Sequence, residues 1–213
     1  MRLLFVLLFA AFPALAQSPE AIAVLERRNV QLDAGQGSPS HALRLTLVYL
    51  DGTGWTPDAI AEAARESARI LGQCGLNLKT AELVRVAAPR RFHDFQTPAS
   101  RELAATLRLE RPTVYFVAGT GQRPAFDAEA IGRGNSRSRP ELRDTVWVTR
   151  GTRDLGIAVT HELAHVLTDS GEHSNEPNNL MRDETAPGNT RLSPAQCARL
   201  RQTGTANGLL SPR

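Results

Sequence analysis

Residues 161–165 read His-Glu-Leu-Ala-His, and this spacing has a geometric meaning only on one kind of backbone. On an α-helix, residues four apart lie on the same face, so the imidazoles of His161 and His165 can reach a single ion while Glu162 projects beside them. The surrounding apolar residues predict a helix over Leu155–Ser170, with Asp154 or Thr152 at its N-cap. The segment therefore predicts a metal-binding helix.

A third metal donor has to come from outside this helix, because a catalytic zinc ion takes three protein ligands and keeps one position open for water. His173 is the leading candidate, since it brings three of the chain's five histidines close together in sequence. Gly171 is placed to end the helix and turn the chain back toward the ion. His41 and His93 are isolated, and we expect them to be structural or surface residues. The carboxylates that remain open as alternative donors are Asp169, Glu172 and Glu176.

The chemistry predicted for such a site is hydrolysis of peptide bonds. A zinc ion lowers the pKa of a bound water and polarises a carbonyl group. Glu162 would accept the proton of that water as the general base and later pass it to the leaving nitrogen. The substrate class is then a peptide or protein. Two alternatives stay open: a zinc hydrolase of other amides or esters, and a non-catalytic envelope protein with a structural or vestigial metal site.

The run HELAHVLTDSGEHSNEPNNLM, together with LSPAQ further on, resembles the zinc-binding region of metzincin metallopeptidases, and within them the matrixin-like members. The resemblance covers residues 155–200. It implies that His161, His165 and His173 are zinc ligands and that Glu162 is the general base. It also implies that Met181 is the methionine of the turn beneath the metal, where a thioether packs as the floor of the site.

The spacing departs from the family pattern HExxHxxGxxH at two positions. That pattern would place glycine at 168 and the third ligand at 171, where this chain has Thr168 and Gly171. His173 therefore comes two residues late. We interpret the difference as an insertion in the turn, with Gly171 forming the bend.

Periodicity along the chain predicts alternating strands and helices. Together with the resemblance, this order implies an α+β, zincin-like fold: a mixed, mostly parallel twisted sheet with an antiparallel edge strand, an active-site helix and a C-terminal helix. The resemblance further implies that the edge strand near Ala128–Gly132 pairs with an extended peptide substrate.

The predicted strands are His41–Asp51, Leu76–Val86, one beginning at Pro112, Ala128–Gly132 and Asp144–Thr149. The predicted helices are Pro19–Arg28, Pro57–Gly75, Ser100–Leu107, the motif helix and one that Ser193 and Pro194 open.

The N-terminus has the pattern of a secretory signal peptide over residues 1–16. Arg2 precedes an apolar run that ends in the small-x-small sequence Ala14-Leu15-Ala16. We therefore expect an exported protein, periplasmic or secreted, that has no stable membrane anchor after processing. Residues 17–40 are predicted to be a flexible segment without the length of an inhibitory prodomain. Residues 41–213 are predicted to form a single catalytic domain, which we expect to be a monomer.

Cysteine content agrees with export. The chain has two cysteines, Cys74 and Cys197, and an oxidising compartment favours a disulfide between them.

Positive and negative charges are nearly balanced: the net charge is +3 and falls to +2 once Arg2 is removed. Because nucleic-acid binders concentrate positive charge along one face, this balance argues against a nucleic-acid partner.

Overall fold

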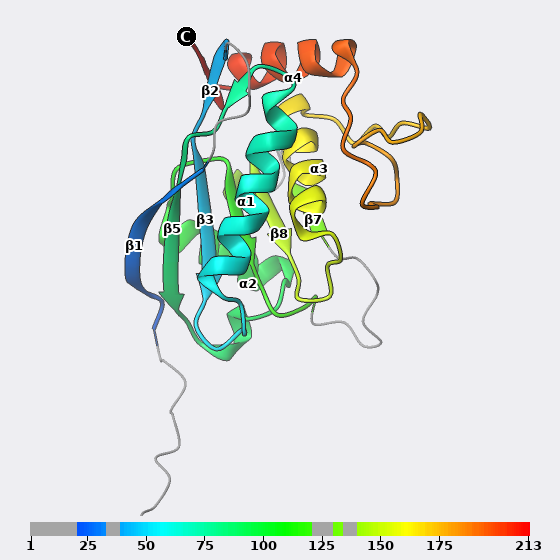
Figure 1. The fold of residues 1–213 in the computed structure, drawn as a ribbon. Coiled ribbons are helices and arrows are strands. Elements are labelled where there is room, and N and C mark those ends of the chain that lie inside the picture. Colours follow the sequence, from blue (N-terminus) through cyan, green and yellow to red (C-terminus); the bar gives the residue numbers. More distant parts are fainter. Residues whose placement is uncertain (1–20, 33–38, 121–129, 134–139) are drawn as a thin grey trace, which may run out of the picture.

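The structure, a computed structural model, describes residues 21–32, 39–120, 130–133 and 140–213 (Figure 1). Its strands are β1 (Ala23–Gln31), β2 (His41–Leu43), β3 (Leu45–Leu50), β4 (Leu76–Asn77), β5 (Thr80–Ala87), β6 (Thr113–Phe116), β7 (Ala130–Arg133), β8 (Thr145–Val148) and β9 (Leu210–Pro212). Its helices are α1 (Pro57–Gly72), α2 (Thr97–Leu107), α3 (Leu155–Thr168) and α4 (Pro194–Ala206), with 3-10 turns at Arg90–Phe92 and Pro140–Leu142.

The main sheet has six strands in the order β1-β5-β3-β6-β8-β7. Its four inner strands are parallel, whereas β1 and β7 pair antiparallel at the two edges. A second, small sheet joins β4, β2 and β9. The predicted α+β class, with a mostly parallel sheet and an antiparallel edge strand, is therefore confirmed, and β1 adds a second antiparallel edge.

Side chains of the inner strands alternate between two apolar layers, as the pleat of a strand requires. In β3, Leu47 and Tyr49 belong to one buried cluster, while Val48 and Leu50 belong to the other. The first cluster includes α1, α3 and α4, and the second includes α2. The sheet is consequently covered on both faces, with α1 and α3 side by side on one of them (Figure 1).

Helix α3 is apolar almost all round because it lies between the sheet, α1 and α4. Close packing against α1 is visible at Ser67, whose hydroxyl accepts a hydrogen bond of 2.9 Å from Thr160. The predicted start at Leu155 is confirmed. Asp154 occupies the N-cap position, but its side chain makes no capping hydrogen bond. The predicted end is not: α3 stops at Thr168, and the left-handed residue that follows is Asp169, with φ 48°.

A capping box and a disulfide stabilise helix α4. Ser193 and Gln196 form a capping box at its start, which confirms the predicted helix opening. Cys197 on α4 forms a disulfide with Cys74, just beyond α1, across 123 residues of sequence. The predicted disulfide is confirmed, and such bonds are typical of oxidising compartments.

The N-terminal part of the chain corrects a prediction. The helix predicted over Pro19–Arg28 is wrong, because Ala23–Gln31 forms β1 and pairs with β5 along its length. This strand lies within the segment 17–40 that was expected to be flexible. The predicted strand His41–Asp51 is divided into β2 and β3, which belong to different sheets. The signal-peptide prediction for residues 1–16 and the beginning of the predicted strand at Ala128 lie outside the described residues.

Across the described ranges, none of the helices combines the length and the apolar composition needed to span a membrane.

Candidate metal centre

Three histidine side chains converge beside the C-terminal half of α3. The Nε2 atom of His165 lies 2.9 Å from that of His161 and 3.2 Å from that of His173. The potential ligand atoms of all three lie within 4.8 Å of one another. The first two rings come from one face of α3, as the spacing predicts, and the chain after the helix returns to bring the third.

Each ring also has a partner for its other nitrogen. His161 Nδ1 donates to the carbonyl oxygen of Leu180 at 2.8 Å, and His165 Nδ1 donates to that of Ser170 at 2.6 Å. His173 Nδ1 lies 3.3 Å from a carboxylate oxygen of Asp183. A carbonyl oxygen can only accept a hydrogen bond, so the neutral rings of His161 and His165 carry their proton on Nδ1 and present a lone pair at Nε2.

This donor set fits a zinc-like cation. Lone pairs that face one another repel, and a cation between them removes the repulsion. At zinc–nitrogen distances of about 2.1 Å, ligating nitrogens of a tetrahedral site lie about 3.4 Å apart, close to the separations found here. Hydrogen bonds from the other ring nitrogen to a carbonyl or carboxylate are the usual way in which ligating histidines are oriented.

Burial keeps two of the rings neutral. It lowers the pKa of His161, which is buried, and it lowers the pKa of the half-buried His165 to about 4, with a further contribution from the neighbouring His161. Since a metal ligand has to be deprotonated, both shifts favour cation binding at neutral pH.

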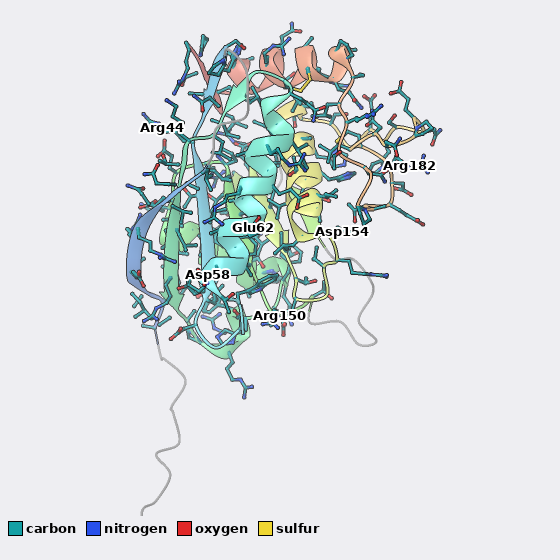
Figure 2. All side chains as sticks on the ribbon, in the orientation of Figure 1. Arg44, Asp58, Glu62, Arg150, Asp154 and Arg182 are labelled. Carbon is teal, nitrogen blue, oxygen red and sulfur yellow. A yellow bond between two sulfur atoms is a disulfide. The ribbon has the colours of Figure 1, made fainter. Side chains whose placement is uncertain are left out.

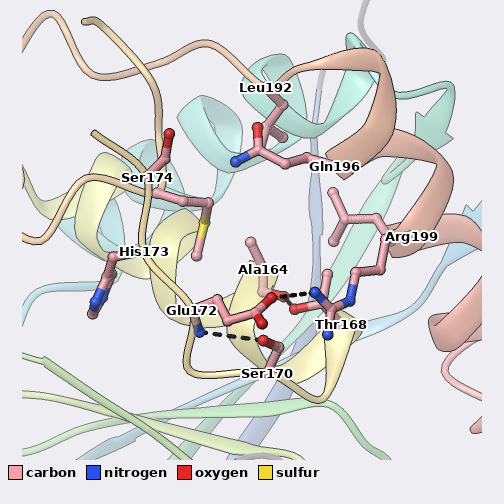
Figure 3. A pocket seen from close by; sticks show the side chains of 11 residues that line it. Ala164, Thr168, Ser170, Glu172, His173, Ser174, Leu192, Gln196 and Arg199 are labelled. Atoms are coloured by element: carbon pink, nitrogen blue, oxygen red, sulfur yellow. Dashed lines mark hydrogen bonds and ion pairs between the residues drawn. The ribbon is translucent and has the colours of Figure 1, made fainter. Parts of the chain in front are cut away.

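The turn that brings His173 back is built by residues other than Gly171. Asp169 adopts the left-handed conformation, and its N–H bonds to carbonyl oxygens of the last helical turn. Glu172 N–H then donates to Ser170 Oγ at 3.2 Å, and the Glu172 carboxylate forms an ion pair with Arg199 of α4. Figure 3 shows Glu172 and Arg199 facing each other beside Ser170, with His173 on the far side of the turn. The expectation that Gly171 forms the bend is therefore wrong.

The alternative carboxylate donors do not join the histidines. Within the described part of the chain, the group able to hold a metal ion consists of His161, His165 and His173, without any of the three carboxylates considered as alternatives. His41 and His93 have other partners, Ser40 Oγ and the carbonyl oxygen of Ala88 respectively.

Met181 is buried next to this cluster. Its N–H donates to Asn179 Oδ1 at 2.9 Å, and the preceding carbonyl, that of Leu180, orients His161. Met181 also lines a cavity of about 220 Å³ between the end of α3 and α4. Ala164, Leu192 and Leu200 contribute apolar atoms to its lining, and Figure 3 shows the cavity from close by.

Glu162 follows His161 directly on α3 and is half-buried. Three groups in the site were missed from the sequence: the carbonyls of Leu180 and Ser170, and the Asp183 side chain. Every residue has a backbone carbonyl, so the sequence does not indicate which of them orient the histidines. A carboxylate two residues after Met181 was a signal that could have pointed to Asp183.

No family model and no curated protein sequence matches this chain. The fold is similar to a crystal structure of metalloproteinase-II from Bacteroides fragilis, with a TM-score of 0.54 and 17% sequence identity. The alignment covers 83% of this chain and 57% of that one, so the chain spans little more than half of that protein's length. In its fold, the chain is thus similar to a metalloproteinase.

Proposed function

We propose that this protein is an exported zinc endopeptidase of the metzincin type, similar to matrixins. The observation that carries the proposal is the convergence of three histidine Nε2 atoms, two of them on one helix with a glutamate beside the first. The fold similarity to a metalloproteinase supports it.

His161, His165 and His173 would hold the ion. When bound there, zinc supplies Lewis-acid chemistry, polarising the scissile carbonyl and acidifying a water molecule. Glu162 accepts the proton of the attacking water and delivers it to the leaving nitrogen, so no nucleophilic serine or cysteine is needed. Met181, which is buried, would form the floor of the site.

Strand β7 offers a place for the substrate backbone. It is the outer strand of the main sheet on the α3 side, paired with β8 along one side. The N–H and C=O groups on the other side of an edge strand are free to pair with an extended chain. A peptide paired with the outer side of β7 would lie next to this strand, which itself contacts α3.

Export is supported by two observations. The Cys74–Cys197 disulfide is typical of proteins in oxidising compartments, and residues 1–16 carry a signal-peptide pattern. We therefore place the mature protein in the periplasm or outside the cell.

The test compares the wild type with Glu162→Gln, using Glu184→Gln as a control for removing a nearby acidic charge. Zinc content and cleavage of casein and of a peptide library are measured for each. We expect all three to retain zinc and Glu162→Gln to lose about 10²- to 10⁴-fold in turnover, the range for a general base. Equal turnover in Glu162→Gln and wild type would refute the mechanism. A wild type that binds zinc but cleaves only esters or non-peptide amides would refute the substrate class.

A further inference from the structure

The third histidine is oriented differently from the other two. His161 and His165 each donate from Nδ1 to a backbone carbonyl, whereas His173 Nδ1 faces a side chain, the carboxylate of Asp183. His173 is also the more exposed ligand candidate, with 38% of its side chain accessible. Its ring therefore depends less on the surrounding core and more on this single contact.

Two hydrogen bonds between neighbouring segments of the chain hold Asp183 opposite His173. Ser174 N–H donates to the carbonyl oxygen of Met181 at 2.6 Å, and Arg182 donates from its guanidinium to the carbonyl oxygen of Asn175 at 3.3 Å. These bonds hold the segment after His173 against the segment after Met181. Arg182 lies in the loops that project beside α3 (Figure 2). The same contacts thus keep Asp183, two residues after Met181, next to His173.

A carboxylate at Nδ1 does two things to an imidazole. It holds the proton on Nδ1, which leaves the Nε2 lone pair directed at the other two histidines. It also makes Nε2 more basic and therefore a stronger metal ligand. Loss of such a partner commonly lowers metal affinity by about 10- to 100-fold.

We propose that Asp183 is a positioning residue for His173, fixing its tautomer and orientation as the third metal ligand. The inference rests on the proposed function, in that the histidines bind zinc. Asp183 acts through His173 and does not itself reach the ion.

The experiment measures zinc dissociation constants by competition with a chromogenic chelator, together with the visible spectrum of the cobalt(II)-substituted protein. The variants are Asp183→Ala, Asp183→Asn and the matched control Glu184→Ala, which removes an equal charge from the next residue. We expect Asp183→Ala to weaken zinc binding by about 10-fold, at the lower end of the range because the carboxylate is exposed. Asp183→Asn should recover part of this loss, since an amide oxygen still accepts the Nδ1 proton. Glu184→Ala should stay within about 2-fold of wild type, as expected for an exposed charge.

The cobalt spectrum separates positioning from general destabilisation. A changed ligand orientation alters the spectrum of Asp183→Ala, whereas a purely structural role leaves it as in wild type. Circular dichroism of the metal-free variants checks that they are folded. If wild type binds zinc and cleaves peptides, but Asp183→Ala equals Glu184→Ala in affinity and spectrum, the inference on Asp183 is overturned and the proposed function stands. A wild type that binds no zinc would overturn the proposed function itself.

Discussion

The Nδ1 atom of His161 donates a hydrogen bond of 2.8 Å to the carbonyl oxygen of Leu180, the residue before Met181. This bond joins α3 to the turn that carries the buried methionine. Because the acceptor is a backbone atom, every residue type at position 180 carries it. The orientation of the first ligand candidate is thus built into the fold and depends on the path of the main chain.

Acidification should destabilise the metal-free protein through His165. Burial lowers its pKa from 6.5 to about 4 in the folded protein, so the unfolded chain takes up the proton first. The contribution of His165 to stability is therefore complete above its ordinary pKa, falls as the pH drops below it, and is lost once the pH passes the folded pKa. Full linkage would give about 3 kcal/mol, and we expect about 1–2 kcal/mol because the ring is only half-buried.

Urea unfolding at pH 7.5 and pH 5, in the presence of a chelator, measures this difference. His165→Gln should lose about 1 kcal/mol less than wild type between the two pH values, because pH 5 still lies above the folded pKa. His41→Gln serves as the control outside the cluster. If wild type and His165→Gln show the same pH dependence, the assignment to His165 is wrong.

Two glycines, Gly156 within α3 and Gly171 after it, should differ in their tolerance of alanine. A Cβ on Gly156 would lie 2.6 Å from the Cβ of Glu66 on α1, so the two helices would have to separate. A Cβ on Gly171 would meet nothing within 4 Å. We expect Gly156→Ala to cost about 1–3 kcal/mol of stability, as overpacking usually does, and Gly171→Ala to change it by less than about 0.5 kcal/mol. Denaturant titration checks both, and a large loss in Gly171→Ala would restore that residue as the bend.

Removal of the disulfide should lower thermal stability strongly. Replacing both cysteines by serine, Cys74→Ser with Cys197→Ser, opens the loop between two positions that are 123 residues apart in sequence. The chain-entropy model gives a loss of about 5 kcal/mol, which corresponds to a fall in Tm of roughly 10–20 °C for a domain of this size. Calorimetry of the double variant and of the reduced wild type should agree. An unchanged Tm would show that the bond does not stabilise the fold.

Proline substitution in β7 tests the proposal that this edge strand binds the substrate backbone. Successive N–H groups along a strand point to opposite sides, so of Ala130 and Ile131 one points toward β8 and the other away from it. One of Ala130→Pro and Ile131→Pro should therefore lower kcat/KM for a peptide with little change in Tm, while the other should lower Tm. If both leave kcat/KM unchanged, β7 does not bind the substrate.

Local signals in the sequence predicted much of the fold. Helix α1 begins at Pro57 as predicted, and Thr56 Oγ1 caps it by accepting the N–H of Ala59 at 3.3 Å. The apolar runs in β6 and β8 also predicted their strands. The pairing of β1 with β5 was not foreseen, because Ala23–Gln31 is exposed along most of its length and carries no clear alternation. Only a contact with a distant strand makes it extended.

In the candidate site, helical spacing predicted that His161 and His165 would converge, and the cluster of histidines drew attention to His173. The bend was assigned to glycine because glycine most readily takes a left-handed backbone. Asp169 adopts that conformation instead, which aspartate tolerates better than most residues. The carbonyl partners of the rings depend on tertiary structure and could not be read from side-chain identity.

The disulfide has a consequence for survival among proteases. His161, His165 and His173 all lie between Cys74 and Cys197. A single backbone cut anywhere in that interval would leave the two fragments covalently joined, and the nicked protein would migrate as one species until a reductant was added. For the exported peptidase proposed above, a single cut by a neighbouring peptidase would therefore release no fragment.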